Sequence, residues 1–243
     1  MHYLLTAFIS ILFVFSEAYA QENKPLSDFH SSIIAKSKSI SESPSPDIVN
    51  SESPHIKPYA AMIQAAKWTT VSIPVCWENP SADYVKEMEW TRDAIHKTWE
   101  AASALKFTGW VKCAAVNNGI RIQIADVGPH VKSLGMLLDR MEKGMVLNFT
   151  FKNWSQTCQS NKENCIRAIA VHEFGHAIGL THEQNRADAP GECRLLAQGP
   201  NPDSALTPYD QDSVMNYCNK NWNNNGFLST MDVIAVQTLY GKP

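Results

Sequence analysis

The pattern of apolar and polar positions predicts regular strands and helices from about Trp68 onward. β-Branched residues dominate residues 70–77, which predicts a strand. Pro74 inside it favours a place near the edge of a sheet, because proline cannot donate a ladder hydrogen bond. Isoleucine alternates with polar residues over 119–125, as is typical of a half-buried strand. Residues 144–151 predict one further strand.

The spacing of apolar residues also predicts two helices in the middle of the chain. Apolar side chains recur at helical intervals over residues 82–105 and again over 164–178. The second helix should stop at Gly179, because glycine readily adopts the left-handed conformation that closes many helices.

A last helix is predicted over residues 230–240. It is preceded by a capping box, Ser229-x-x-Asp232, and followed by Gly241. Strands first, with helices interspersed, predict an α+β domain over residues 66–243, which is an ordinary size for one domain.

The N-terminal part of the chain follows a different pattern. Residues 4–15 form a short apolar run that leads to small residues ending at Ala20, so residues 1–20 read as a signal peptide. Residues 21–65 are rich in Ser, Pro, Lys and Glu and would bury little apolar area, which predicts a disordered linker or pro-segment. No segment has the roughly 20 apolar residues that a membrane-spanning helix needs. The sequence therefore predicts a secreted protein without a membrane span.

Charge and cysteine content narrow the class of protein further. The formal net charge of -3 and the mixed surface argue against a nucleic-acid or anionic-membrane partner. Six cysteines in an exported chain indicate disulfides, and the absence of a C-x-x-C pair disfavours a thiolate zinc site. Many pairings are open to six cysteines. The pairs that we expect are Cys158–Cys165, which closes a short loop, Cys193–Cys218 and Cys76–Cys113.

The strongest chemical signal lies at the end of the predicted 164–178 helix. His172 and His176 are one turn apart, with Cβ atoms about 6 Å from each other, so both imidazoles can reach one metal ion. Gly179 lets the backbone turn, and His182 then approaches from a new direction as a third ligand. Three neutral nitrogens leave a fourth coordination position open, which a catalytic zinc site requires.

Glu173 lies beside the predicted metal without ligating it. Displaced around the helix from His172, its carboxylate can take a proton from the attacking water. A lone histidine on an apolar helix is usually a packed or surface residue. Three histidines, one glutamate and one glycine at the required positions favour the catalytic zinc site over packing alone.

Two motifs resemble a known group of enzymes. The pattern HExxHxxGxxH over residues 172–182 resembles the metzincin clan of zinc endopeptidases. Within that clan, HEQNR at 182–186 and SVMNY at 213–217 resemble the astacin family and its Met-turn. The resemblance implies a metzincin-like fold with a twisted mixed sheet, an active-site helix, a Met-turn and a C-terminal helix. It also implies zinc as the cofactor.

The resemblance assigns roles to three further residues. Met215 would lie beneath the metal as an apolar base, although ordinary core packing is the alternative. Tyr217 would bind the metal or move to the transition state, and its alternative is a rim or core aromatic. Glu183 resembles the residue that ties down the mature N-terminus in the family; a salt bridge with Arg186 is the alternative.

These observations predict a secreted zinc endopeptidase with Glu173 as general base. A protein or peptide substrate would lie extended along an edge strand. The resemblance to metzincins implies that this strand precedes the active-site helix, so we expect residues 144–151 to form it. The alternative is a secreted binding or adhesion module that keeps the metzincin fold without hydrolysis. Substrate specificity and oligomeric state are left open by the sequence.

Overall fold

The computed structural model describes residues 61–243. The signal peptide predicted at 1–20, and all but the last five residues of the linker predicted at 21–65, lie outside the described residues. Those last five residues belong to the folded part, because strand β1 (Ala61–Met62) pairs antiparallel with β7 (Ser204–Ala205).

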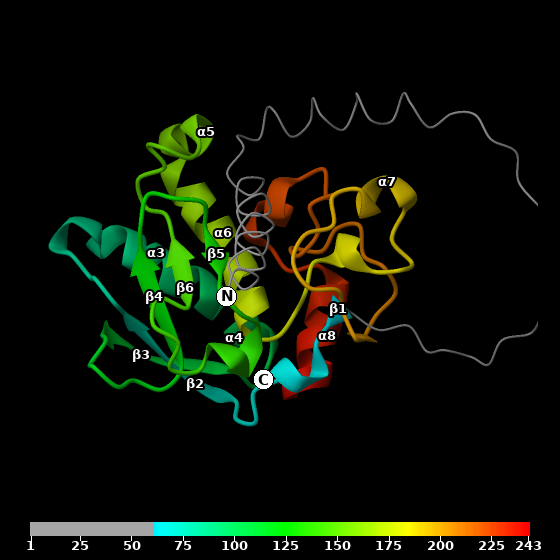
Figure 1. Cartoon of the computed structure of the whole chain (residues 1–243), viewed down its shortest axis with the longest axis horizontal. Coiled ribbons are helices and arrows are strands. Elements are labelled where there is room, and N and C mark those ends of the chain that lie inside the picture. The colour runs from blue at the N-terminus through cyan, green and yellow to red at the C-terminus, as the bar shows by residue number, and fades with distance from the viewer. Residues whose placement is uncertain (1–60) are drawn as a thin grey trace, which may run out of the picture. The chain divides into compact units, whose positions relative to one another are not determined.

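The main sheet has five strands in the order β3-β2-β4-β6-β5. Parallel pairing joins β2 to β3, β2 to β4 and β4 to β6, whereas β5 pairs antiparallel with β6. The sheet is therefore mixed, as the resemblance implied (Figure 1). Its strands are β2 (Ser72–Trp77), β3 (Lys106–Lys112), β4 (Ile120–Ile124), β5 (His130–Val131) and β6 (Met145–Leu147).

The strand predicted near an edge at 70–77 is β2, which lies second from one edge, between β3 and β4. Pro74 is accommodated there because pairing with β4 begins only at Val75. The strand predicted at 144–151 is reduced to β6, and it is not an edge because β5 covers its outer side.

The helix predicted over 82–105 is divided into three pieces. These are η2 (Ala82–Tyr84), α3 (Val85–Lys97) and α4 (Trp99–Ala102). The helix breaks at Thr98, whose φ of -116° and ψ of -91° are not helical. The break accompanies the complete burial of Trp99, whose indole N–H donates to the carbonyl of Val171, 2.9 Å away.

The other predicted helices are confirmed. Helix α6 (Lys162–Ala177) carries the two histidines, and α8 (Thr230–Tyr240) begins at the predicted capping box. Figure 1 shows α6 between the main sheet and α8. No helix within residues 61–243 has the length and apolar character to cross a bilayer. The remaining helices are η1 (Gln64–Ala66), η3 (Gly135–Leu138), α5 (Gln156–Ser160), η4 (Glu183–Asn185), α7 (Gly191–Arg194) and η5 (Trp222–Gly226).

The core forms where α6 packs against the sheet. Residues 168–177 of α6 are buried on every side, as expected for a helix in the centre of a domain. Phe174 meets Phe107 of β3 edge-on at 5.0 Å between ring centroids and stacks on Trp110 at 5.6 Å. Because Phe174 lies between His172 and His176, these contacts hold α6 firmly at the histidines themselves.

All three expected disulfides are present. Cys76–Cys113, Cys158–Cys165 and Cys193–Cys218 are each closed, with no free cysteine in the described residues. Because such bonds persist in oxidising compartments, they agree with the predicted export of the chain.

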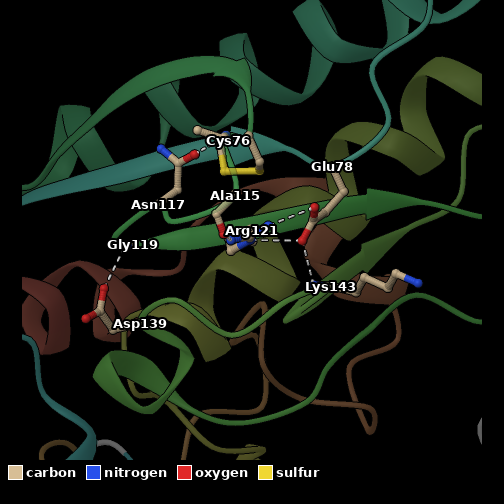
Figure 2. Close-up of a disulfide and its surroundings, with 10 residues drawn as sticks. Cys76, Glu78, Ala115, Asn117, Gly119, Arg121, Asp139 and Lys143 are labelled. Atoms are coloured by element: carbon tan, nitrogen blue, oxygen red, sulfur yellow. Dashed lines mark hydrogen bonds and ion pairs between the residues drawn. A yellow bond between two sulfur atoms is a disulfide. The ribbon is translucent and has the colours of Figure 1, made fainter.

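A buried ion pair lies close to the first of these disulfides (Figure 2). The Arg121 guanidinium donates twice to the Glu78 carboxylate, at 2.9 and 3.1 Å, and once to the carbonyl of Ala115 at 3.2 Å. Glu78 also accepts from the N–H of Lys143 at 2.9 Å. The ion pair therefore connects the loop after β3 and the residues just before β6 to the sheet.

This ion pair should make stability depend on pH. The hydrogen bond from Arg121 holds the pKa of Glu78 below its usual 4.5. The unfolded chain therefore binds the proton first, so the stabilisation is present above pH 4.5 and is lost as pH falls through the folded-state pKa. At pH 7, Glu78→Gln should cost about 1–3 kcal/mol, the usual cost of leaving a buried donor such as the Arg121 guanidinium without its hydrogen-bond partner.

Urea unfolding of both proteins between pH 7 and pH 3 measures this effect. The difference in unfolding free energy between wild type and Glu78→Gln should shrink steadily below pH 4.5. A difference that is constant across this range would contradict the assignment.

Candidate metal centre

The end of α6 brings the ligand histidines together. His172 and His176 are one turn apart, and the helix ends just before Gly179, which has a φ of +98°. This left-handed residue is the predicted stop, and it turns the chain so that His182 comes back toward the helix. Leu180 forms an isolated antiparallel β-bridge with Met62 of β1, and this contact holds the turn against the rest of the domain.

The imidazoles converge at a distance that suits one zinc ion. The Nε2 atom of His182 lies 3.2 Å from that of His172 and 3.1 Å from that of His176. Tetrahedral nitrogen ligands about 2.0–2.1 Å from a zinc ion lie about 3.3 Å apart. Among residues 61–243 these three form the only cluster of His, Cys, Asp or Glu found close enough to share an ion. The residues present therefore fit a zinc ion with three protein ligands.

A backbone carbonyl fixes the outer nitrogen of each ring. His172 Nδ1 lies 2.8 Å from Val214 O, His176 Nδ1 lies 2.9 Å from Leu180 O, and His182 Nδ1 lies 2.9 Å from Gln198 O. A carbonyl can only accept, so each Nδ1 carries the proton and each Nε2 presents its lone pair to the shared point. The tautomers required of metal ligands are thus set by the fold.

Burial keeps these rings neutral. Desolvation by burial, and to a smaller extent electrostatic repulsion from the neighbouring His182, lowers the pKa of His172 to about 3. Burial likewise lowers the pKa of His182 to about 4 and that of His176 well below 6.5. A metal ligand must be deprotonated, so at neutral pH no proton has to be displaced before an ion binds.

The Met-turn packs directly against the ligand helix. Met215 is 2% exposed, and a Cβ atom added to Gly175 would lie 2.3 Å from its sulfur. Gly175 therefore makes room for Met215 beside His176, a requirement that the sequence analysis missed. The Tyr217 ring stacks on that of His172 at 5.4 Å and lies 4.4 Å from that of His182. Both predicted Met-turn residues are thus close to the histidines.

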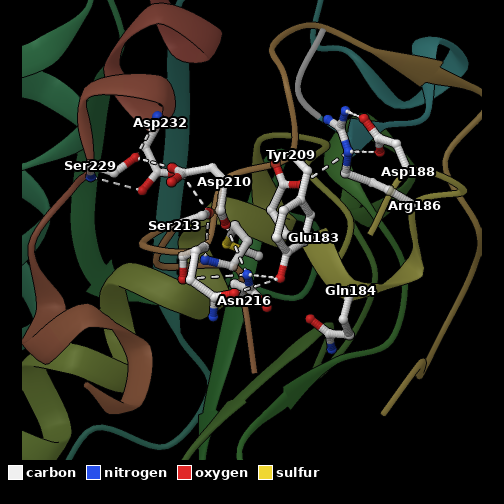
Figure 3. Close-up of polar contacts among 12 residues, drawn as sticks. Glu183, Gln184, Arg186, Asp188, Tyr209, Asp210, Ser213, Asn216, Ser229 and Asp232 are labelled. Carbon is white, nitrogen blue, oxygen red and sulfur yellow. Dashed lines mark hydrogen bonds and ion pairs between the residues drawn. The ribbon is translucent and has the colours of Figure 1, made fainter. Parts of the chain in front are cut away.

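The buried carboxylate of Asp232 links α8 to the Met-turn (Figure 3). It accepts from the Ser213 hydroxyl at 2.7 Å, from Val214 N–H at 2.9 Å and from Ser229 N–H at 2.9 Å. Since the Val214 carbonyl accepts from His172, the capping box of α8 supports a predicted ligand. The sequence predicted the capping role of Asp232, but not this tertiary one.

Glu183 lies in a second buried ionic group, also seen in Figure 3. Its carboxylate is 3.2 Å from Arg186 Nε, and Arg186 also donates twice to Asp188 at 2.7 Å. Burial raises the pKa of Glu183 to about 8, although Arg186 opposes this. The salt bridge considered above is therefore present, and the role of Glu183 in tying down a mature N-terminus stays a prediction.

Glu173, the predicted base, follows His172 on the same helix. It is 6% exposed and is not part of the three-histidine cluster. The helix therefore carries a buried carboxylate one residue after the first of the clustered histidines, and its role as the base stays a prediction.

The chain is similar in sequence to known proteins. The family profile described as Peptidase_M10, Matrixin, matches residues 68–189, which is half of the chain. The chain is 38% identical over 69 residues to "Zinc metalloproteinase nas-36" of Haemonchus contortus, a match that covers 23% of this chain and 11% of that protein. It is 35% identical over 78 residues to "High choriolytic enzyme 2" of Oryzias latipes, covering 27% of this chain and 28% of the relative. The chain thus spans less than a third of either relative.

A solved structure supports the fold. Myroilysin aligns with 76% of this chain and with 100% of its own at a TM-score of 0.52 and 19% sequence identity. At this identity the likeness concerns the fold alone. Together with the family match and the three converging histidines, it leads to one conclusion. The chain belongs to the matrixin family of zinc metallopeptidases and has the metzincin-type, astacin-like domain that its motifs predicted.

Proposed function

We propose that this protein is a secreted zinc endopeptidase that hydrolyses peptide bonds in protein or peptide substrates. The observation that carries the proposal is the convergence of three buried imidazoles, each with its Nδ1 atom held by a carbonyl. His172, His176 and His182 would bind the ion and leave a fourth position for chemistry. A structural zinc site would normally be closed by four protein ligands.

Glu173 would move the protons of the reaction. When bound, zinc lowers the pKa of water toward neutrality and polarises the scissile carbonyl. The Glu173 carboxylate would accept the proton of the attacking water and deliver it to the departing amine. Its place on α6, one residue after a ligand, supports this role because the rigid helix fixes its distance from the ion.

Tyr217 would stabilise the charge that develops on the substrate oxygen. Its ring lies against those of His172 and His182, so its hydroxyl can reach a group bound beside them. A phenol donates one hydrogen bond, which is what an oxyanion requires. Met215 would support the site from below by packing on the ligand helix.

An extended substrate would pair with β5 (His130–Val131). This strand is one of the two edges of the main sheet, and it contacts α6. Strand β6 cannot serve because both of its sides are occupied. The outer side of an edge strand can offer main-chain hydrogen bonds to an incoming peptide.

The proposal includes secretion of the protein from the cell. The three disulfides favour an oxidising compartment, and they agree with the signal peptide predicted at residues 1–20.

Cleavage of casein or gelatin, with and without a zinc chelator, tests the function. We expect cleavage by the purified protein, its loss on chelation and its return when zinc is added. A fully zinc-loaded protein that cleaves no protein substrate would instead support the silent binding module.

A further inference from the structure

The three carbonyls that orient the histidines differ in how they are held. Val214 belongs to the buried Met-turn, where its N–H is bound by Asp232. Leu180 is buried and bridges to β1. The carbonyl that accepts from His182 belongs to Gln198, between α7 and β7, in a segment whose residues 197–201 are exposed or half-buried.

The segment around Gln198 has little packing of its own. Gly199 has a φ of +72°, and a Cβ atom added there would meet nothing within 4 Å. The disulfide Cys193–Cys218 anchors the chain five residues before Gln198, and β7 anchors it again at Ser204. Between these anchors, another contact must hold the peptide that faces His182.

The Asn185 side chain makes that contact. Its Oδ1 atom accepts from Gln198 N–H at 3.0 Å, and its Nδ2 group donates to Gln198 O at 2.7 Å and to Pro200 O at 3.0 Å. Asn185 is itself tied to the third histidine, because its N–H donates to the carbonyl of His182 at 3.2 Å. One amide therefore holds both backbone hydrogen-bonding groups of Gln198, the residue whose carbonyl orients His182.

We infer that Asn185 is a positioning residue for the third zinc ligand, acting through the backbone of Gln198. The inference rests on the proposed zinc role of His182. The carbonyl oxygen of Gln198 has two lone pairs and accepts from Asn185 and His182 together. Without the amide, this peptide can turn to water, and His182 loses the acceptor that keeps the proton on Nδ1. Loss of such an outer hydrogen bond typically weakens metal binding by about 10–100-fold.

Zinc affinity, measured by competition with a chromophoric chelator, tests the inference without relying on activity. Asn185→Leu keeps the size of the side chain and removes its hydrogen bonds; it should bind zinc about 10–100-fold more weakly than wild type. Asn185→Asp keeps the acceptor but places a second oxygen against Gln198 O, so it should weaken binding as well. Thermal unfolding of the zinc-free variants establishes that they are folded.

Asn79 provides a matched control. It holds the peptide of Ile124 in the same way, accepting from its N–H and donating to its carbonyl, both at 2.9 Å, at the end of β4. Asn79→Leu should leave zinc affinity unchanged.

The outcomes separate this inference from the proposed function. Wild-type affinity in folded Asn185→Leu, or equal weakening in Asn79→Leu, would overturn the role of Asn185 and leave the zinc site standing. Failure of the wild-type protein to bind zinc would overturn both.

Discussion

Replacing Glu173 by alanine should lower kcat by roughly 10²–10⁴-fold, the usual contribution of a general base, while zinc stays bound. The proposed ligands are the three clustered histidines, so replacing Glu173 leaves all of them in place. What disappears is the carboxylate that would accept the proton of the attacking water. Peptide hydrolysis rates and zinc content, measured on the same preparation, check the result.

Glu163→Ala is the control for this variant. Glu163 lies in the first turn of the same helix and pairs with Arg167 at 2.9 Å on the surface, so its loss should change neither zinc content nor kcat. Wild-type proteolysis by a zinc-loaded Glu173→Ala protein would refute the assignment of the base.

Replacing Tyr217 by phenylalanine should lower kcat by roughly 10²–10³-fold, as is typical when one oxyanion donor is removed. The change removes only the hydroxyl, so the ring can still pack at 5.4 Å from His172 and 4.4 Å from His182. Because the donor would act on charge that develops during the reaction, KM and zinc affinity should change little. Steady-state kinetics on a fluorogenic peptide measure the two constants separately.

Tyr84→Phe serves as the matched change at a distance. Tyr84 packs edge-on against Phe149, with 5.9 Å between ring centroids, and is not in contact with the histidines. It should leave kcat unaltered. If Tyr217→Phe instead retained full kcat, Tyr217 would be a packing residue. If it lost zinc, Tyr217 would be a metal ligand or a structural support and not a donor to the transition state.

The local features of the site could be predicted because they depend on short stretches of chain. The spacing of His172 and His176 on a helix follows from 3.6 residues per turn, and the stop at Gly179 follows from the freedom of glycine at positive φ. The capping box of α8 is local in the same sense. Each of these features depends only on residues that are close together in the chain, so the sequence alone suffices to predict it.

The order of the strands could not be predicted in this way. Residues 144–151 have the apolar character of a strand, but whether a strand lies at an edge depends on which distant segment pairs with it. The short β5 (His130–Val131) covers β6 and itself becomes the edge. With only two residues, β5 has too little alternation for a periodicity argument to detect it. The break at Thr98 was missed for a related reason, since burial of Trp99 against α6 outweighs helix continuity.

By itself, the sequence determined the kind of chemistry: which side chains could bind zinc, which carboxylate could serve as the base, and that the cysteines are paired. The tertiary structure alone decided how the imidazoles are oriented, through the carbonyls of Val214, Leu180 and Gln198. Every residue has a carbonyl, so no pattern of side chains marks those that will face a histidine. Only the folded backbone, held there by residues such as Asp232 and Asn185, selects them.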